Sequence, residues 1–589
     1  MVRRRKLLAG AAATVALAGT LAGLATSGAS AAVTAASAKA AAGSAPGEFL
    51  VVFKQGQREA ALGAIKGNGG VVVKEDAKLG YALVRAFGAN FAEGVSESRS
   101  AIVGVARNQP IGHVPKGQGI PQPRDVKGED DKVNAKRGTR VTGATPTAAT
   151  APKAKKGEEP LAGLQWDMKM IGATATGSHA KERGSKKVLV GVIDTGIDGK
   201  HPDIAPNFNR ELSRNFTVDI PHDANGAEID GKCEYANCVD PADVDHDGHG
   251  THVASTIGSP INGLGMAGIA PNVSLVNLRA GQDSGYFFLK PTLDALTYAG
   301  DKGIDVVNMS FYVDPWLYNC AGNAADSPAE SSEQRAIIEA TQRAVNYARA
   351  RGVTLISALG NDATDLGNPK VDESSPGFPK GAEKTRKVDN TCVDVPTELQ
   401  GVISVSSVGQ SKRKAYYSNY GIEQTDLAAP GGDTYDNKTK QRDVRGAILA
   451  AAPANVLWRD GLLNKNGTPK KDSGVIRDCK PGKGCAYYQY LQGTSMAAPH
   501  ATGVAALIIS RFGNGKLSPS ITEARLYSTA TDTACPSPRT YTYTRYPVDP
   551  ETGKPTKVTD SHTCVGTKVK NGFYGRGIVN ALAAATAKR

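Results

Sequence analysis

The feature that most constrains the fold is an alternation of short apolar runs with amphipathic helices, which begins near residue 161. Residues 187–193 form an apolar run that is typical of a strand buried on both faces of a parallel sheet. The same pattern predicts further strands, separated by helices such as one over residues 333–350. These strands are expected at residues 273–278, 306–309, 353–357 and 402–408. The alternation predicts an α/β fold, with a mostly parallel sheet that is covered by helices on both faces.

A smaller α/β unit is expected ahead of this region, at about residues 47–118. Apolar, β-branched runs predict its strands, and Ala-rich or amphipathic stretches predict its helices. The expected strands are 48–54, 70–74, 81–85 and 111–114, and the expected helices are 59–66 and 91–102. This order of elements is the ferredoxin-like arrangement. Residues 119–160 are rich in Gly, Pro, Lys, Ala and Thr and lack apolar periodicity, which predicts a flexible linker.

Residues 1–31 have the pattern of a secretory signal peptide. A basic start is followed by an apolar, Ala-rich stretch, and a small-residue site predicts cleavage after Ala31. A transmembrane anchor is the alternative, but the many Ala and Gly residues favour removal. No later stretch is long and apolar enough to span a bilayer. We therefore expect a secreted, extracellular protein that has no contact with the membrane once the signal is removed.

The formal net charge of +13 does not by itself indicate a nucleic-acid partner. Binding of that kind needs Lys and Arg clustered with aromatic residues on one element. The basic residues between positions 127 and 156 lie in an Ala-, Gly- and Thr-rich stretch without aromatic residues. We therefore expect no nucleic-acid partner, and we interpret the charge as a basic linker on a soluble protein.

The eight cysteines fit an exported protein with disulfide bonds. Cys233/Cys238 and Cys479/Cys485 are close enough to close small loops, and Cys535/Cys564 bracket a polar, hairpin-like segment. Cys320 and Cys392 would then remain as the fourth pair. Eight cysteines allow 105 pairings, so other pairings stay open. A metal site is the other alternative, but the cysteines lack the spacing of metal ligands.

Three segments carry residues that are suited to nucleophilic catalysis. Asp194 follows the apolar run at 187–193, and the carboxyl ends of parallel strands form the active crevice of α/β sheets. His249 opens a helical stretch beside Gly250, where it is well placed as a general base. Ser495 opens an apolar helix, where free N–H groups and the helix dipole favour negative charge.

Each segment also has a structural interpretation when it is taken alone. Asp194 can cap the turn that follows it, and Ser495 can be an ordinary N-cap. The spacing of His249 and His252 can suggest zinc, but the Glu of an HExxH motif is absent. A serine hydroxyl becomes a good nucleophile only beside a base. The hypothesis therefore depends on the three segments acting together.

The sequence from about residue 165 to 585 resembles the subtilase family of serine peptidases. The catalytic residues would occur in the chain order Asp, His, Ser, which is the order found in subtilisin. The matching segments are Ile193-Asp194-Thr195-Gly196, His249-Gly250-Thr251-His252-Val253-Ala254, Val307-Asn308-Met309-Ser310, Gly360-Asn361, Ala429-Pro430-Gly431, Gly493-Thr494-Ser495-Met496-Ala497 and Gly575-Arg576-Gly577-Ile578-Val579-Asn580. The resemblance implies a subtilisin-like three-layer α/β fold over residues 161–589.

The resemblance also implies catalytic roles for particular residues. Ser495 would attack the scissile carbonyl, His249 would move the proton, and Asp194 would orient His249. The side-chain amide of Asn361, with the backbone N–H of Ser495, would form the oxyanion hole. No cofactor is implied for this chemistry, and the implied substrates are proteins and peptides.

The segments around Ser310 and Asn361 would bind the substrate. In the family, the strand around Ser310 pairs with extended substrate backbone and lines the pocket for the P1 side chain, the residue on the acyl side of the cut. The residues implied at this site are Ser310, Phe311, Tyr312, Ala358 and Gly360. Subtilisins usually continue the strand with Gly where this chain has bulkier residues. The usual preference for large apolar P1 residues is therefore in doubt.

Structural calcium is a further implication of the resemblance. Asp203 and Asn262 would supply side-chain ligands, and Pro260, Leu264 and Met266 would supply backbone oxygens. A further glutamine ligand of the family falls on Ala162 here, which is a departure from the pattern. A second acidic stretch, residues 243–248, lacks the Glu of an EF-hand loop, and we interpret it as a polar loop that presents His249.

The resemblance implies a self-inhibited zymogen. Residues 32–118 would be a propeptide that acts as an intramolecular inhibitor, and the linker at 119–160 would carry the processing site. An unrelated small domain that stays attached is the alternative. The expected protein is a monomeric, secreted endopeptidase. The competing hypotheses are an exopeptidase, which needs one end of the cleft to be closed, and a silent binding scaffold, which predicts a lost triad residue.

Three inserts depart from the simplest members of the family. They lie near residues 210–243, 433–488 and 531–571, and the sequence alone assigns them no role.

Overall fold

The computed structural model describes residues 47–87, 90–108, 139–140, 154, 157–549 and 552–588. All of them belong to one structural unit, Ser44–Arg589. The predicted signal peptide and most of the predicted linker lie outside the described residues.

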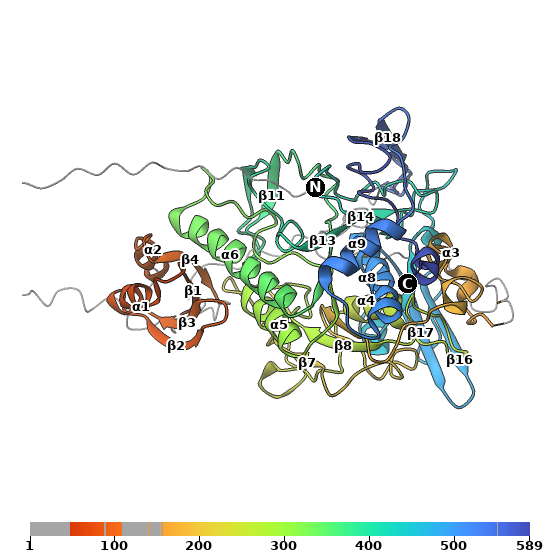
Figure 1. Ribbon diagram of the computed structural model, residues 1–589, viewed down its shortest axis with the longest axis horizontal. Coiled ribbons are helices and arrows are strands. Elements are labelled where there is room, and N and C mark those ends of the chain that lie inside the picture. Colours follow the sequence, from red (N-terminus) through yellow and green to blue (C-terminus); the bar gives the residue numbers. More distant parts are fainter. Residues whose placement is uncertain are drawn as a thin grey trace, which may run out of the picture. The chain divides into compact units, whose positions relative to one another are not determined.

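A seven-stranded sheet forms the centre of the larger domain (Figure 1), in the order β14-β13-β10-β9-β6-β8-β7. Neighbouring strands pair in parallel; Val190, for example, is in register with Leu275 on one side and Val306 on the other. The strands are β6 (Leu189–Ile193), β7 (Arg214–Asn215), β8 (Ser274–Arg279), β9 (Val306–Met309), β10 (Thr354–Ala358), β13 (Val402–Val408) and β14 (Leu427–Pro430). The predicted α/β fold and all five predicted strands are confirmed.

Helices cover both faces of this sheet. Alternate side chains of one strand enter different cores: Val192 packs in the core that contains α4 (His249–Gly258) and α8 (Thr494–Gly513). Ile193 packs in the core that contains α5 (Leu289–Asp301) and α6 (Pro328–Ala350), which lie side by side in Figure 1. This two-sided burial explains the continuous apolar runs of the sequence.

The predicted helix at 333–350 begins earlier, at Pro328, because of a strong start signal. Ser327 and Glu330 form a capping box, in which each side chain bonds to the backbone N–H of the other residue. Proline at the first helical position loses no helical hydrogen bond.

The N-terminal part forms a separate four-stranded antiparallel sheet, in the order β2-β3-β1-β4. Its elements are β1 (Gly47–Phe53), α1 (Arg58–Gly67), β2 (Val71–Asp76), β3 (Tyr81–Ala86), α2 (Phe91–Ser96) and β4 (Ile102–Arg107). The ferredoxin-like order is confirmed. The predicted helix at 91–102 was too long, because Ile102 starts β4 and pairs with Phe53. The strand predicted at 111–114 lies outside the described residues.

The two faces of this small sheet pack against different partners. Phe49 and Val51 belong to a core shared with Ile65 of α1 and Phe91 of α2. Leu50, Val52, Leu79, Tyr81 and Ala106 instead join the core of α5 and α6. The small unit is therefore bound to the outer surface of the helical layer that covers one face of the central sheet.

The inserts form hairpins and short elements around the sheet. In the insert near 433–488, β16 (Val475–Lys480) and β17 (Gly484–Gln492) pair as a hairpin, and β17 leads directly into α8. The end of β17 also pairs with β5 (Thr139–Arg140) from the linker region. The remaining elements are α3 (Trp166–Ile171), β11 (Val371–Ser375), β12 (Lys384–Lys387), β15 (Ile448–Ala451), α7 (Ala454–Arg459), α9 (Pro519–Thr529), β18 (Thr540–Arg545), β19 (Val558–Thr563) and α10 (Ala581–Thr586).

All eight cysteines are paired as predicted. The bonds are Cys233–Cys238, Cys320–Cys392, Cys479–Cys485 and Cys535–Cys564. Each of the three inserts therefore contains one disulfide. Within the described residues, no helix combines the length and the apolar composition that spanning a bilayer requires.

Candidate active site

The three predicted catalytic residues lie at the ends of regular elements. Asp194 directly follows β6, His249 is the first residue of α4, and Ser495 is the second residue of α8. A residue at a strand end or in a first helical turn is held by the backbone of a rigid element. Packing of α4 against both β6 and α8 brings the three elements together.

Asp194 and His249 form a buried pair. The distance between Asp194 Oδ1 and His249 Nδ1 is 2.7 Å. The backbone N–H of Thr195 donates to the same carboxylate oxygen at 2.8 Å, which fixes its orientation. A carboxylate bonded to Nδ1 directs Nε2 of the ring outward, where that atom can act as a base.

Two glycines allow the two motifs to approach each other. A Cβ atom on Gly250 would lie 2.0 Å from the carbonyl oxygen of Gly196. Gly196 itself has a φ of +139°, and a Cβ there would lie 2.4 Å from the carbonyl oxygen of Val244. A side chain at either position would therefore push His249 away from Asp194.

The polar loop at 243–248 presents His249, as the sequence predicts. Asp245 is buried, and its carboxylate accepts hydrogen bonds from the backbone N–H groups of Gly248 and Thr251, at 2.8 and 3.0 Å. The Thr251 hydroxyl also donates to it, at 2.6 Å. Asp245 thus satisfies N–H groups at the start of α4, which otherwise lack partners.

Ser495 is buried beside the strand segment that is expected to bind the substrate. Its hydroxyl donates to the carbonyl oxygen of Ser310 at 3.3 Å, and the Ser310 hydroxyl donates to the carbonyl oxygen of Ser495 at 3.0 Å. Among the described residues, His249 Nε2 has no hydrogen-bond partner. The Ser495 hydroxyl therefore has to turn from Ser310 toward His249, and such bonds commonly tighten only when substrate is bound.

Asn361 follows Gly360 just beyond β10 and is anchored to the start of α8. Its Oδ1 atom accepts hydrogen bonds from the backbone N–H and the hydroxyl of Thr494, both at 2.8 Å. These bonds fix the amide oxygen against Thr494, the residue before Ser495. With Oδ1 fixed, the direction of the Nδ2 donor on the same amide is also fixed. An oxyanion hole beside Ser495 would need a donor that is held in this way.

The five residues predicted to bind substrate lie together with Ser495 around one pocket. These are Ser310, Phe311, Tyr312, Ala358 and Gly360. Phe311 is buried by a parallel stack with Phe287, whose ring centroid is 4.2 Å away. A seventh lining residue, Asp394, was not predicted. It belongs to no recognisable motif, and the Cys320–Cys392 disulfide gives the main sequence signal that its segment folds back to this site.

The residues predicted as calcium ligands also lie together. Asp203 is buried, and its carboxylate accepts from Asn262 Nδ2 at 2.9 Å and from the Tyr488 hydroxyl at 3.0 Å. Asn262 Oδ1 has no hydrogen-bond partner among the described residues. No hydrogen bond between described residues uses the carbonyl oxygens of Pro260, Leu264 and Met266.

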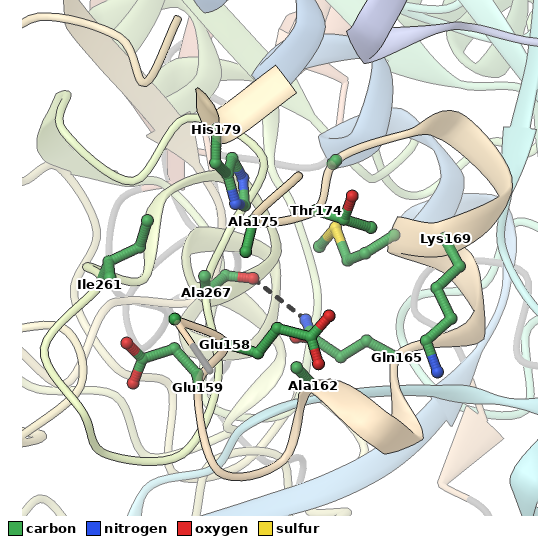
Figure 2. Close-up of a pocket in the computed structure, with 13 residues that line it drawn as sticks. Glu158, Glu159, Ala162, Gln165, Lys169, Thr174, Ala175, His179, Ile261 and Ala267 are labelled. Carbon is green, nitrogen blue, oxygen red and sulfur yellow. Dashed lines mark hydrogen bonds between the residues drawn. The ribbon is translucent and has the colours of Figure 1, made fainter. Parts of the chain in front are cut away.

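Glu159, rather than Ala162, directs a carboxylate to this loop (Figure 2). Its Oε1 atom accepts from the backbone N–H of Gly263 at 3.0 Å, and its Oε2 atom lacks a partner within the described part of the chain. Burial raises the pKa of both the Glu159 and the Asp203 carboxyl groups. Two buried carboxylates and unpaired carbonyl-type oxygens match the hard oxygen ligands that calcium prefers.

The fold and the site together define a class of protein. An α/β domain with a parallel sheet holds a buried Asp–His pair, and a serine at the start of a helix that packs against the helix of the histidine, in the chain order Asp, His, Ser. This combination is that of serine-nucleophile hydrolases with a subtilisin-type arrangement.

Comparison with known sequences identifies the family. The Subtilase family (peptidase S8) matches residues 185–559, so the chain belongs to that family of subtilisin-like serine peptidases. Subtilisin DY of Bacillus licheniformis is 27% identical over 345 residues, which cover 59% of this chain and 84% of that protein. The thermophilic serine proteinase of Bacillus sp. (strain AK1) is 28% identical over 333 residues, 56% of this chain and 54% of the relative. The chain thus matches only about half the length of that relative.

Solved structures support the fold. The epidermin leader peptide processing serine protease EpiP of Staphylococcus aureus aligns with a TM-score of 0.57 and 20% identity, over 92% of this chain and 99% of that one. Fervidolysin of Fervidobacterium pennivorans aligns with a TM-score of 0.52 and 18% identity, over 92% and 61%. Both alignments extend beyond the region that the family match covers.

Proposed function

We propose that this chain is a serine endopeptidase that hydrolyses peptide bonds in proteins through an acyl-enzyme. The observation that carries the proposal is the 2.7 Å contact between His249 and Asp194, in a site that also contains Ser495 and Asn361. Ser495 Oγ attacks the scissile carbonyl carbon, and its proton passes to His249 Nε2. The same proton then goes to the leaving amine, and water releases the acyl group by the reverse route.

Two groups stabilise the negative charge that develops on the carbonyl oxygen. One is the backbone N–H of Ser495, since the first N–H groups of a helix have no partner within it. The other is the side-chain amide of Asn361, held by its two bonds to Thr494. The N-terminal end of α8 adds a favourable dipole for this charge.

We also propose that the chain is made as a secreted, monomeric zymogen in which the small unit is the propeptide. Contacts with α6 support this role. The Arg343 guanidinium donates to the carbonyl oxygens of Phe53 and Leu79, at 2.9 and 3.0 Å. The Ser332 hydroxyl accepts from the backbone N–H of Val105 at 3.0 Å. A unit bound in this way supports a helical layer that must pack before the catalytic site forms.

Calcium is proposed as a structural ligand of the loop at 260–266. Asp203, Glu159 and Asn262 would hold it, together with the backbone oxygens of Pro260, Leu264 and Met266. A bound divalent cation would offset the two buried carboxylates and hold the loop against β17. It takes no part in the peptidase reaction, for which no cofactor is required.

The experiment that tests the function compares the secreted protein with its Ser495→Ala variant. We expect the first to cut casein internally and to lose its N-terminal hundred-odd residues, and the variant to do neither. Ser528→Ala, an exposed serine of α9, is the matched control and should behave like the unchanged protein. Casein assays and N-terminal sequencing give both readouts.

The outcomes also separate the competing hypotheses. Release of single residues or dipeptides from casein ends, without internal fragments, would indicate an exopeptidase. A folded protein that neither cuts casein nor reacts with a serine-directed fluorophosphonate would favour a binding scaffold and contradict the proposal.

A further inference from the structure

A carboxylate lies in the pocket that borders the nucleophile. Asp394 lines this pocket together with Gly360 and Ser495, although it is far from both in the sequence. A Cβ atom on Gly360 would lie 2.4 Å from Asn419 Nδ2 and 3.5 Å from Asp394 Oδ2, so the glycine lets the backbone approach both side chains. Its enclosed space is small, about 10 Å³, so a substrate side chain has to enter through the open mouth of the pocket.

The Asp394 carboxylate is buried without full compensation. The residue is 3% exposed, and its Oδ1 atom has no hydrogen-bond partner among the described residues. Within the same part of the chain, neither Asp394 nor its acidic neighbour Asp362 forms an ion pair with Lys or Arg. Ionisation of a buried carboxyl group is costly as long as it has no cationic partner. The pocket therefore favours an incoming cation.

Two other acidic groups, Glu398 and Asp362, lie close enough to affect the Asp394 carboxyl. Burial raises the pKa of the Asp394 carboxyl well above its usual range, and the charges of Glu398 and Asp362 raise it further. Burial also raises the pKa of Asp362, to about 6. A positive charge that enters the pocket would reverse these shifts, because it stabilises the ionised carboxylates.

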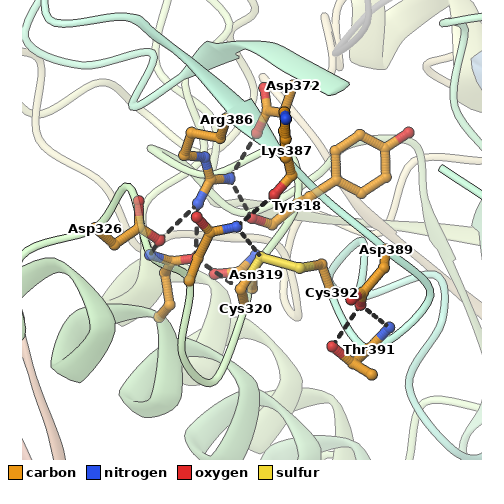
Figure 3. Close-up of a disulfide and its surroundings, with 12 residues drawn as sticks. Tyr318, Asn319, Cys320, Asp326, Asp372, Arg386, Lys387, Asp389, Thr391 and Cys392 are labelled. Carbon is orange, nitrogen blue, oxygen red and sulfur yellow. Dashed lines mark hydrogen bonds and ion pairs between the residues drawn. A yellow bond between two sulfur atoms is a disulfide. The ribbon is translucent and has the colours of Figure 1, made fainter. Parts of the chain in front are cut away.

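Asp394 is held rigidly, as a selective site requires. Its backbone N–H donates to Glu398 Oε2 at 2.8 Å, and its carbonyl accepts from the Glu398 N–H at 3.0 Å. Two residues earlier, Cys392 is bonded to Cys320 (Figure 3). One residue later, the carbonyl of Val395 accepts from the backbone N–H of Val313 at 2.8 Å, next to Tyr312.

A buried ion-pair network supports the other side of the disulfide. The Arg386 guanidinium lies between Asp326 and Asp372, at 2.9 and 2.6 Å, and also donates to the carbonyl of Tyr318 at 2.6 Å (Figure 3). The two terminal nitrogens of the Arg386 guanidinium make these contacts. Arg386 therefore contributes to the support of the pocket and does not neutralise Asp394.

We propose that Asp394 makes this protease select substrates with a cationic P1 side chain, arginine or lysine. The inference rests on the proposed peptidase function and deepens it. A guanidinium or ammonium group would pair with the Asp394 carboxylate, and the Tyr312 ring in the pocket wall would contact the stem of the side chain. An apolar P1 side chain would instead leave the carboxylate buried and unpaired. Phe311 and Tyr312, which replace the usual glycine of this strand, would thus belong to a pocket with a different P1 specificity.

The test uses the secreted, self-processed protein and peptides that differ only at P1, with Arg, Lys, Gln, Leu or Phe. We expect kcat/KM for Arg and Lys to exceed that for Gln, Leu and Phe by on the order of 100-fold, as for a buried charge pair. In Asp394→Asn, the Arg and Lys values should fall to about the Gln value, while the Leu value changes little. Asp389→Asn is the matched control, because it lies in the same segment but is exposed and outside the pocket.

Different failures have different meanings. A wild-type preference for Leu or Phe over Arg would overturn the inference even if Asp394→Asn did not fold. Equal P1 profiles for wild type and folded Asp394→Asn would overturn it as well. Inactivity on every peptide, with no fluorophosphonate labelling of Ser495, would instead overturn the proposed function on which the inference rests.

Discussion

At the scale of single residues, the site depends on side chains whose partners fix their direction. His249 is directed by Asp194, and Asn361 is directed by Thr494. Such pairs matter because a catalytic group has to be correctly oriented before substrate arrives. The same principle applies to Asp394, whose backbone is fixed by Glu398.

Replacement of Asn361 by Ala should lower kcat by roughly 100- to 1,000-fold, because one of the two proposed oxyanion donors is lost. KM should change little, since the donor acts mainly on charge that develops in the transition state. Steady-state kinetics on a single peptide substrate measure both values. A fall confined to KM would contradict the assignment. Thermal unfolding serves as the control for folding, because Thr494 also loses a bond partner.

The sequence predicts those site residues that lie in short local motifs and misses those that only the fold brings in. Asp194, His249, Ser495 and Asn361 are each marked by neighbours, such as the glycine at 250, that the backbone needs. Asp394 and Glu159 have no such neighbours, and they reach the site through a disulfide segment and a turn before α3. Long-range placement of this kind does not follow from local periodicity.

At the scale of elements, the insert near 210–243 contributes Asp219 and Asp240 to a buried cluster of charges beside the loop that presents His249. The Arg279 guanidinium pairs with Asp219 and Asp283, at 3.1 and 2.8 Å, and with Asp240. His246 Nδ1 lies 3.1 Å from Asp240 Oδ2 and 3.4 Å from Asp283 Oδ2. Through these ion pairs, the insert links Arg279, at the end of β8, to His246 in the loop at 243–248.

This cluster predicts a loss of stability at alkaline pH. Asp240 first, and then Asp283, raise the pKa of His246 to about 10, against about 6.5 in an unfolded chain. The stabilisation by protonated His246 is therefore fully present below about pH 6.5 and is lost as the pH rises through about 10. Between about pH 6.5 and pH 10, the Tm of His246→Gln should fall by roughly 1–3 °C less than the Tm of the unchanged protein. Exposed His222→Gln is the control, and identical Tm profiles for all three proteins would contradict the prediction.

The loop at 260–266, where we propose that calcium binds, gives a second prediction for an element. Calcium should raise the Tm of the Ser495→Ala chain, because a ligand that binds only the folded state adds about 2.7 kcal/mol at 100 times its Kd. Asn262→Ala and Asp203→Asn should each abolish this rise, and exposed Asp532→Asn should retain it. Scanning calorimetry with added calcium or with chelator measures the effect. A Tm that is indifferent to both would contradict the proposed site.

At the scale of the whole molecule, two packed bodies share one layer of helices. Helices α5 and α6 cover the central sheet with one face and receive the small antiparallel sheet on the other. Gly104 of β4 lies so close to α6 that a Cβ atom there would be 2.1 Å from the carbonyl oxygen of Ser332. The small sheet therefore approaches α6 most closely where Gly104 lies against the backbone of that helix.

Gly104→Ala should separate the two bodies and lower the yield of mature protein, because the proposed propeptide would no longer support the helical layer. Gly63→Ala, at an exposed position of α1 where a Cβ meets nothing within 4 Å, is the matched control. The amount of mature protein in the medium, measured by immunoblot, gives the readout. An unchanged yield in Gly104→Ala would contradict a folding role for this unit.

The contacts of Arg343 have a consequence for the divergence of the small unit. Arg343 donates to the backbone carbonyls of Phe53 and Leu79, which almost any amino acid at those positions would also provide. Mutations that change the exposed side chains of β2 or α1 would leave these acceptors in place. Natural selection would then preserve the backbone conformation of the small unit and the glycine at position 104. The small unit should consequently differ in sequence between orthologues more than the larger α/β domain does.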